Sequence, residues 1–112
     1  RDSYSDTDNQ GLREACQHFE RAISLDETLS DAYAYLALCG FWDLVHFTSE
    51  DSKATLEMMK NRGRKAETLN PENPLALIGL AAHYFFSGDF VNAINHAEKA
   101  VNYNPNYALS LW

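Results

Sequence analysis

Apolar residues recur at helical spacing along most of the chain. No segment alternates apolar and polar residues with the period of two that a strand requires, so the pattern predicts helices alone. The clearest stripe, at i, i+3, i+4, i+7, i+8, i+11 and i+12, consists of Tyr33, Leu36, Ala37, Gly40, Phe41, Leu44 and Val45. We expect helices over residues 9–25, 31–46, 50–69, 74–87 and 90–103, with another starting near 107.

The segment RKAETLNPENPLALIGL, residues 64–80, places two prolines between two helical runs. A proline disfavours helical geometry in the residue before it, so Asn70-Pro71 should end one helix. A proline at the first helical position loses no hydrogen bond, so Asn73-Pro74 should provide the cap and first residue of the next helix. The segment therefore predicts a tight hinge between antiparallel helices.

This hinge recurs along the chain. It returns at YNPNYALSL, residues 103–111, and at LDETLSDAY, residues 25–33, where Glu27 replaces the proline. The alanines five residues before the two proline hinges, Ala66 and Ala100, are 34 residues apart. A fixed period of this length indicates an array of helical repeats.

The last full unit resembles the tetratricopeptide repeat (TPR), with leucine and alanine in place of that family's tryptophan and glycine. Its matching positions are Leu77, Leu80, Ala81, Tyr84, Gly88, Ala93, Ala97, Ala100 and Pro105. The preceding unit matches at Tyr33, Leu36, Ala37, Gly40, Met59, Gly63, Ala66 and Pro71. RAISLD followed by DAYAYLAL also resembles TPR regions of bacterial signalling proteins, including winged-helix transcription activators and adenylate cyclases.

The resemblance implies an all-α fold, a right-handed α-solenoid of antiparallel helix pairs that forms a TPR-like superhelix. We interpret the chain as one TPR-like domain over residues 1–112, part of a longer protein. Its expected units are the second helix of a partial repeat (1–29), a repeat with an insertion (30–73), a regular repeat (74–107) and the start of another (108–112). The insertion includes a loop at residues 46–53.

Charge and hydropathy limit the classes of partner. Acidic residues outnumber Lys and Arg sixteen to nine, giving a net charge of −7. Because nucleic-acid binding depends on clustered cations, we expect no nucleic acid to bind this segment, and we interpret KNRGRK, residues 60–65, as a solvated helix face. No apolar run approaches the roughly 18 residues of a membrane span, so we expect no membrane contact through this segment.

No motif in the chain predicts an enzyme, a cofactor or a metal site. DTDNQG, residues 6–11, begins like a calcium loop, but Gln10 and Gln17 occupy ligand positions, so we interpret Asp8 or Asn9 as a helix cap. The four histidines show neither an HxxxH pair nor HExxH, which argues against metal binding. His46, near the end of its helix, is expected to interact with the terminal carbonyl groups.

The two cysteines, Cys16 and Cys39, lie on the apolar stripes of helices that should be neighbours. A disulfide is geometrically possible, but we favour buried thiols, because free cysteine behaves as a small hydrophobe. The chain has no Asn-x-Ser/Thr sequon, and we expect a cytoplasmic protein. A periplasmic sensor segment is the alternative.

With no motif for an enzyme, a cofactor or a metal site, we expect the chain to act through a binding surface. The resemblance to TPR arrays implies that the first helix of each pair lines a concave groove that binds a protein or peptide partner. The expected groove residues are Leu38, Phe41, Trp42, Leu75, Ile78, Ala82, Phe85 and Phe86. The leading hypothesis is a protein-protein interaction scaffold within a larger bacterial signalling or regulatory protein.

The alternative hypothesis is a self-association (dimerisation) module of a transcription regulator or adenylate cyclase, in which a second copy of the chain is the partner. The last apolar residues, Leu109, Leu111 and Trp112, are expected to contact another molecule or fold back onto the preceding helices, since each apolar face in a repeat array is covered only by its neighbours.

Overall fold

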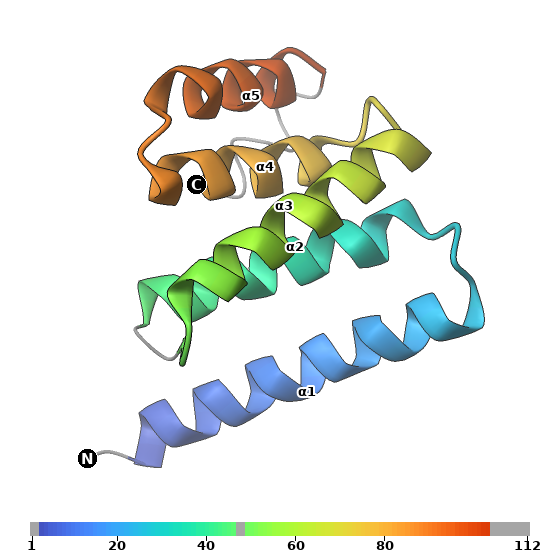
Figure 1. Ribbon diagram of the computed structural model, residues 1–112. Helices are drawn as coiled ribbons and strands as arrows, with labels where there is room; N and C mark the ends of the chain where they lie inside the picture. Colours follow the sequence, from blue (N-terminus) through green and yellow to red (C-terminus); the bar gives the residue numbers. More distant parts are fainter. Residues whose placement is uncertain (1–2, 47–48, 104–112) are drawn as a thin grey trace.

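The computed structural model of the protein describes residues 3–46 and 49–103, and every secondary-structure element within these ranges is an α-helix (Figure 1). The helices are α1 (Ser3–Leu25), α2 (Ser30–Val45), α3 (Ser52–Leu69), α4 (Pro74–Ser87) and α5 (Phe90–Tyr103). The all-α prediction is confirmed, and the predicted bounds of α4 and α5 agree with the observed ones. The helix expected near residue 107 and the residues Leu109, Leu111 and Trp112 lie outside the described residues.

The start of α1 differs from the prediction. The helix begins at Ser3 rather than near residue 9, so residues 6–11 have helical backbone. Neither a calcium loop nor a cap by Asp8 or Asn9 is therefore present. Asp and Asn cost at most about 0.7 kcal/mol each in a helix interior relative to alanine, which is too little to force a helix to start there.

The predicted hinge between α3 and α4 is confirmed. α3 ends at Leu69, and the backbone N–H of the capping residue Asn70 donates to the carbonyl oxygen of Ala66. The Asn73 side chain caps α4, because its Oδ1 accepts a hydrogen bond from the backbone N–H of Leu75 at 3.0 Å. Pro74 is the first residue of α4, as its missing N–H allows.

Figure 1 shows the helices stacked in chain order, with α1 at one side of the molecule and α5 at the other. α2 packs against α3 and α4 against α5, while α4 also contacts both α2 and α3. Among the described helices, α1 contacts only α2, and α5 contacts only α4. The core therefore lies around α2, α3 and α4, and each outer helix is covered on one side.

Small residues let the helices pack closely against one another. Ala34, Ala37 and Ala66 are fully buried. A Cβ atom added to Gly63 of α3 would lie only 2.8 Å from Cδ2 of Leu80 in α4. A methyl group at Gly40 of α2 would likewise meet Met59 of α3, at 2.5 Å from its Cγ atom. Glycine at these two positions lets the side chain of the facing helix lie against the backbone.

Cys16 of α1 and Cys39 of α2 form a disulfide, and the expectation of buried thiols is wrong. Their Cα atoms are 6.3 Å apart, within the range that a disulfide spans. The helical periodicity places both cysteines on facing stripes. The periodicity does not fix the position of α1 along the axis of α2. In the structure, the register of these two helices places the two cysteines opposite each other.

A buried polar junction joins α2, α3 and α4. Asn73, only 4% exposed, donates both hydrogens of Nδ2, one to Ser30 Oγ at 2.9 Å and one to Asp31 Oδ1 at 2.8 Å. The Ser30 hydroxyl in turn donates to the carbonyl oxygen of Ala66 at 2.8 Å. The side chains of Asn73 and Ser30 together link the first turns of α2 and α4 to the last turn of α3.

Replacing Asn73 by alanine should lower the free energy of unfolding by about 1–3 kcal/mol, because the α4 cap is lost and the side chains of Ser30 and Asp31 lose a hydrogen-bond donor. Asn73→Asp is the matched variant: it keeps an oxygen for the Leu75 N–H but sets a carboxylate against Asp31. Urea denaturation measures the free energy of unfolding of both variants. The junction contributes little if neither variant differs from the parent by more than about 0.5 kcal/mol, the usual range for surface substitutions.

Candidate functional site

An apolar hollow of about 460 Å³ opens between the last turns of α2 and α4 and the first half of α5. Its lining residues are Phe41, Val45, Ala81, Ala82, Phe85, Phe86, Ala93, Ile94 and Ala97. All nine side chains end in carbon atoms. We call this site the α2–α4–α5 hollow.

Aromatic rings form one wall of the α2–α4–α5 hollow. The ring of Phe86 lies 5.8 Å from that of Phe41 and 5.3 Å from that of Phe85, between centroids. Phe85 also contacts Phe90 of α5 at 5.7 Å in an edge-on arrangement. These contacts join the C-terminal turns of α2 and α4 to the first turn of α5. The remaining lining is mostly alanine, whose short side chains leave room for another group.

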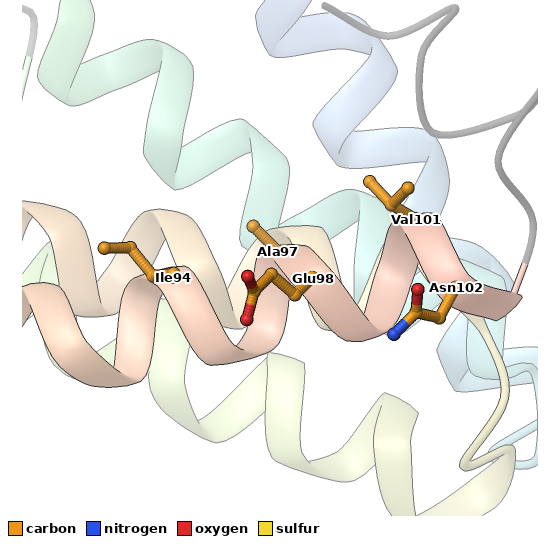
Figure 2. A pocket seen from close by; sticks show the side chains of 5 residues that line it. All are labelled: Ile94, Ala97, Glu98, Val101 and Asn102. Atoms are coloured by element: carbon orange, nitrogen blue, oxygen red, sulfur yellow. The ribbon is translucent and has the colours of Figure 1, made fainter.

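The hollow continues along the outer face of α5. A second depression there is lined by side chains that recur every three or four residues along one helix (Figure 2): Ile94, Ala97, Glu98, Val101 and Asn102. Ile94 and Ala97 line both depressions, so the two form one surface. We call the apolar row Ile94, Ala97 and Val101 the α5 strip.

The eight predicted groove residues fall into three groups. The structure brings Phe41, Ala82, Phe85 and Phe86 together around the α2–α4–α5 hollow. Trp42 is exposed but does not line the hollow; its indole instead stacks on the ring of His46, with centroids 5.4 Å apart. His46 Nδ1 lies 3.0 Å from the carbonyl oxygen of Trp42, which confirms the interaction expected at this helix end.

Three predicted groove residues of α2 and α4 face the core instead. Leu75 and Ile78 are only 2% and 7% exposed, so neither can contact a partner without unpacking the core. Leu75 packs in a cluster with residues of α2 and α3, and Ile78 in a second cluster with Ala100 of α5. Leu38 is half-buried against both clusters. The physical reason is that α4 is covered from two sides, by α2 and α3 and by α5.

The predicted groove residues include none from α5, although α5 lines the α2–α4–α5 hollow. Phe90, Ile94, Ala97 and Val101 follow a regular helical stripe, which predicts a core face. The structure leaves Ile94 58% exposed, because no other described helix packs against this side of α5. Periodicity identifies which residues share a face. The position of α5 at the end of the stack decides that this face stays open.

Charged groups are sparse around the site. α4 carries no Asp, Glu, Lys or Arg, and Glu98 lies beside the α5 strip. Lys99, by contrast, follows Ala97 by two residues, which places it on another side of the helix. The surroundings therefore combine an apolar surface with a negative charge at its edge.

His83 is a buried titratable group outside the hollow, on the side of α4 that faces α3. Its Nδ1 lies 2.8 Å from the carbonyl oxygen of Leu56 and donates to it. Burial lowers the pKa of His83 below its usual value, and Lys60 and Arg64 act in the same direction. The Leu56 hydrogen bond and Glu57 oppose this change of pKa. His83 is therefore kept neutral between α3 and α4.

Acidification should accordingly destabilise the fold through His83. The unfolded chain takes up a proton near pH 6.5, whereas the folded protein resists it until a lower pH, so stability falls as pH drops from about 6.5 through the folded-state pKa. We expect His83→Asn to lose less stability than the parent protein between pH 7 and pH 5, because the asparagine side chain takes up no proton in this pH range. Denaturant unfolding at several pH values measures the two slopes. Parallel slopes would show that His83 does not cause the effect.

No group of three or more His, Cys, Asp and Glu within the described residues is arranged to hold a metal ion. Among the described helices, none combines the length and the apolar character needed to cross a membrane. No family model and no curated protein sequence matches this chain.

Proposed function

We propose that this chain is a protein-binding segment whose α2–α4–α5 hollow and α5 strip receive a helix of a partner protein. The observation that carries the proposal is the continuous apolar surface that the described helices leave open beside α5, with Phe85 and Ile94 exposed within it. Exposed apolar patches of this kind mark interaction sites in soluble domains. We further propose that the helix pairs belong to a TPR-like solenoid in a larger bacterial signalling or regulatory protein.

The shape of the surface favours a helical partner. Ile94, Ala97 and Val101 follow one another at helical intervals and extend over roughly 10 Å of the helix axis. A partner helix with apolar residues at the same intervals can place its side chains between them. The alanines of the hollow permit a close approach of the two backbones, as Gly63 does between α3 and α4.

Charge favours a basic partner helix. The chain has a net charge of −7, and Glu98 borders the α5 strip. Opposite charges on a partner accelerate association and suppress acidic competitors, although they add little affinity by themselves. The proposed partner is therefore an amphipathic helix with an apolar face for the hollow and lysine or arginine beside it.

A synthetic peptide of about four helical turns tests this proposal, with leucines at i, i+3, i+4 and i+7 and lysines at most other positions. Burying three apolar side chains contributes about 5–9 kcal/mol before the cost of association, so we expect sub-millimolar affinity by fluorescence anisotropy. The control is a peptide of the same composition without the helical spacing, which should bind at least tenfold more weakly. Equal binding of the two peptides would contradict the proposal, because charge alone would then explain it.

Self-association is the second candidate function, favoured by the same exposed face of α5. A second copy could cover Phe90 and Ile94 as a partner helix would. Sedimentation equilibrium separates the two candidates: a dimer that the leucine-lysine peptide dissociates would assign the surface to self-association. A monomer that binds the peptide supports the scaffold function.

The Cys16–Cys39 disulfide bears on the compartment. Disulfides persist mainly in oxidising compartments, whereas cytosolic proteins usually keep their thiols reduced. This observation supports the periplasmic alternative over the cytoplasmic location expected from the sequence. Mass spectrometry of the protein isolated under thiol-blocking conditions would show which form the cell contains.

A further inference from the structure

α1 is attached to the rest of the described protein through a single neighbouring helix. It contacts only α2 among the described helices. The contacts between them include the Cys16–Cys39 disulfide, a stack of Phe19 on Tyr35 with centroids 4.7 Å apart, and packing of Ile23 against the core cluster that contains Tyr33 and Ala34. α2, in contrast, is held by three helices.

The packing of α1 is also looser than that of the other interfaces. Its described inward-facing residues are only half-buried: Ala15, Cys16, Phe19, Ala22 and Ile23. On α2, many of the residues in the core are fully buried, Ala34 and Ala37 among them. Half-buried side chains contribute less hydrophobic stabilisation, which scales with the apolar area removed from water. The covalent link therefore carries a large share of the attachment of α1.

We propose that the Cys16–Cys39 disulfide is a redox-cleavable tether, and that its reduction by a dithiol releases α1 from α2 while α2 to α5 stay folded. In the oxidised protein, the tether keeps α1 over Tyr35 and Cys39. In the reduced protein, α1 detaches and uncovers this part of α2. Whether α1 is attached to α2 thus depends on the redox state of the cysteine pair.

Accessibility favours Cys16 as the point of attack. Cys16 is half-buried, whereas Cys39 is only 8% exposed. A thiolate of the dithiol attacks Sγ of Cys16, which forms a mixed disulfide and releases Cys39 as a thiolate that takes up a proton. The second thiolate of the dithiol then attacks the dithiol sulfur that is bonded to Cys16 in the mixed disulfide. The bond between that sulfur and Sγ of Cys16 breaks, and Cys16 leaves as a thiolate that is protonated. The dithiol ends as a cyclic disulfide, having given two electrons and two protons to the cysteine pair.

Hydrogen–deuterium exchange of the whole chain, with and without dithiothreitol, tests the tether. We expect amides of residues 13–25 to exchange at least tenfold faster after reduction, with unchanged exchange in α4 and α5. The double variant Cys16→Ser/Cys39→Ser should match the reduced protein without any reductant and should not respond to it. Phe19→Ala is the matched control, because it weakens the same contact but keeps the disulfide, so its α1 should remain attached until the reductant is added.

Three results would overturn the proposal. Unchanged exchange of α1 on reduction would show that packing alone holds the helix. Faster exchange in α4 and α5 together with α1 would show that the disulfide stabilises the whole fold rather than one helix. Two free thiols in the protein purified in air, counted by mass after alkylation, would show that the tether does not form.

Discussion

Leu80→Ala should lower the free energy of unfolding by about 2–5 kcal/mol, as truncations of fully buried leucines do. Leu80 is 1% exposed and lies where α4 meets α3, with its side chain against Gly63. The truncation removes apolar contacts and leaves a cavity where α3 and α4 pack closely together. Because domains of this size are stable by only about 5–15 kcal/mol, the loss should be visible as a large shift of the urea midpoint.

Gly63→Ala tests the same contact from the other side. The new methyl group would lie 2.8 and 2.9 Å from Cδ2 and Cγ of Leu80, so the helices must move apart or Leu80 must shift. Overpacking of this kind costs about 1–3 kcal/mol, from which the higher helix propensity of alanine returns up to about 1 kcal/mol. Gly11→Ala is the matched control, since no atom lies within 4 Å of its added Cβ, and it should be neutral or stabilising.

The double variant Gly63→Ala/Leu80→Ala makes the prediction specific. The alanine at residue 80 leaves room for the methyl group at residue 63, so the double variant should be more stable than the sum of the single effects predicts. We expect a coupling of at least about 0.5 kcal/mol, as for residues in direct contact. Additive effects in a urea-denaturation cycle would contradict the close packing of α3 on α4.

The second large effect concerns binding. Ile94→Glu should weaken binding of the leucine-lysine peptide at least tenfold, because it removes an apolar contact worth about 1.5–3 kcal/mol and sets a carboxylate against the apolar face of the peptide. The added negative charge attracts the basic peptide, so long-range electrostatics would change the affinity in the opposite direction. A loss of affinity therefore identifies a direct apolar contact at Ile94.

Leu25→Glu is the control for this variant. Leu25 is 82% exposed at the end of α1 and lies outside the hollow, and the substitution changes the net charge by the same amount. Its affinity should equal or slightly exceed that of the parent protein. Fluorescence anisotropy with both variants decides the matter: if Leu25→Glu loses affinity as Ile94→Glu does, the α5 strip is not the binding surface.

Helix ends were predictable where backbone chemistry dictates them. Pro71, Pro74 and Gly88 fix the ends around α3, α4 and α5, since proline lacks an N–H and Gly88 adopts a left-handed φ of 87°. The start of α1 has no such residue, only Ser, Asp and Asn, which favour a cap without forcing one. The prediction there was wrong by six residues, from 9 to 3.

The binding surface was less predictable, because it depends on which helix faces are covered. The resemblance to TPR arrays assigned Leu75 and Ile78 to an open groove, and helical spacing assigned Ile94 to the core. The arrangement of the helices reverses both assignments. The partners of Asn73 are 42 and 43 residues away in the sequence, so only its capping role could be predicted. The disulfide depends in the same way on the register of α1 against α2.

Nuclear Overhauser effects between the leucine-lysine peptide and the isotope-labelled protein would locate the bound peptide, because they report atoms in contact. We expect contacts from the peptide's leucine methyls to the rings of Phe85 and Phe86 and to the methyls of Ile94, with none to Leu25. Contacts confined to the surface of α1 or α3, with no effect at Ile94 at saturating peptide, would contradict this expectation.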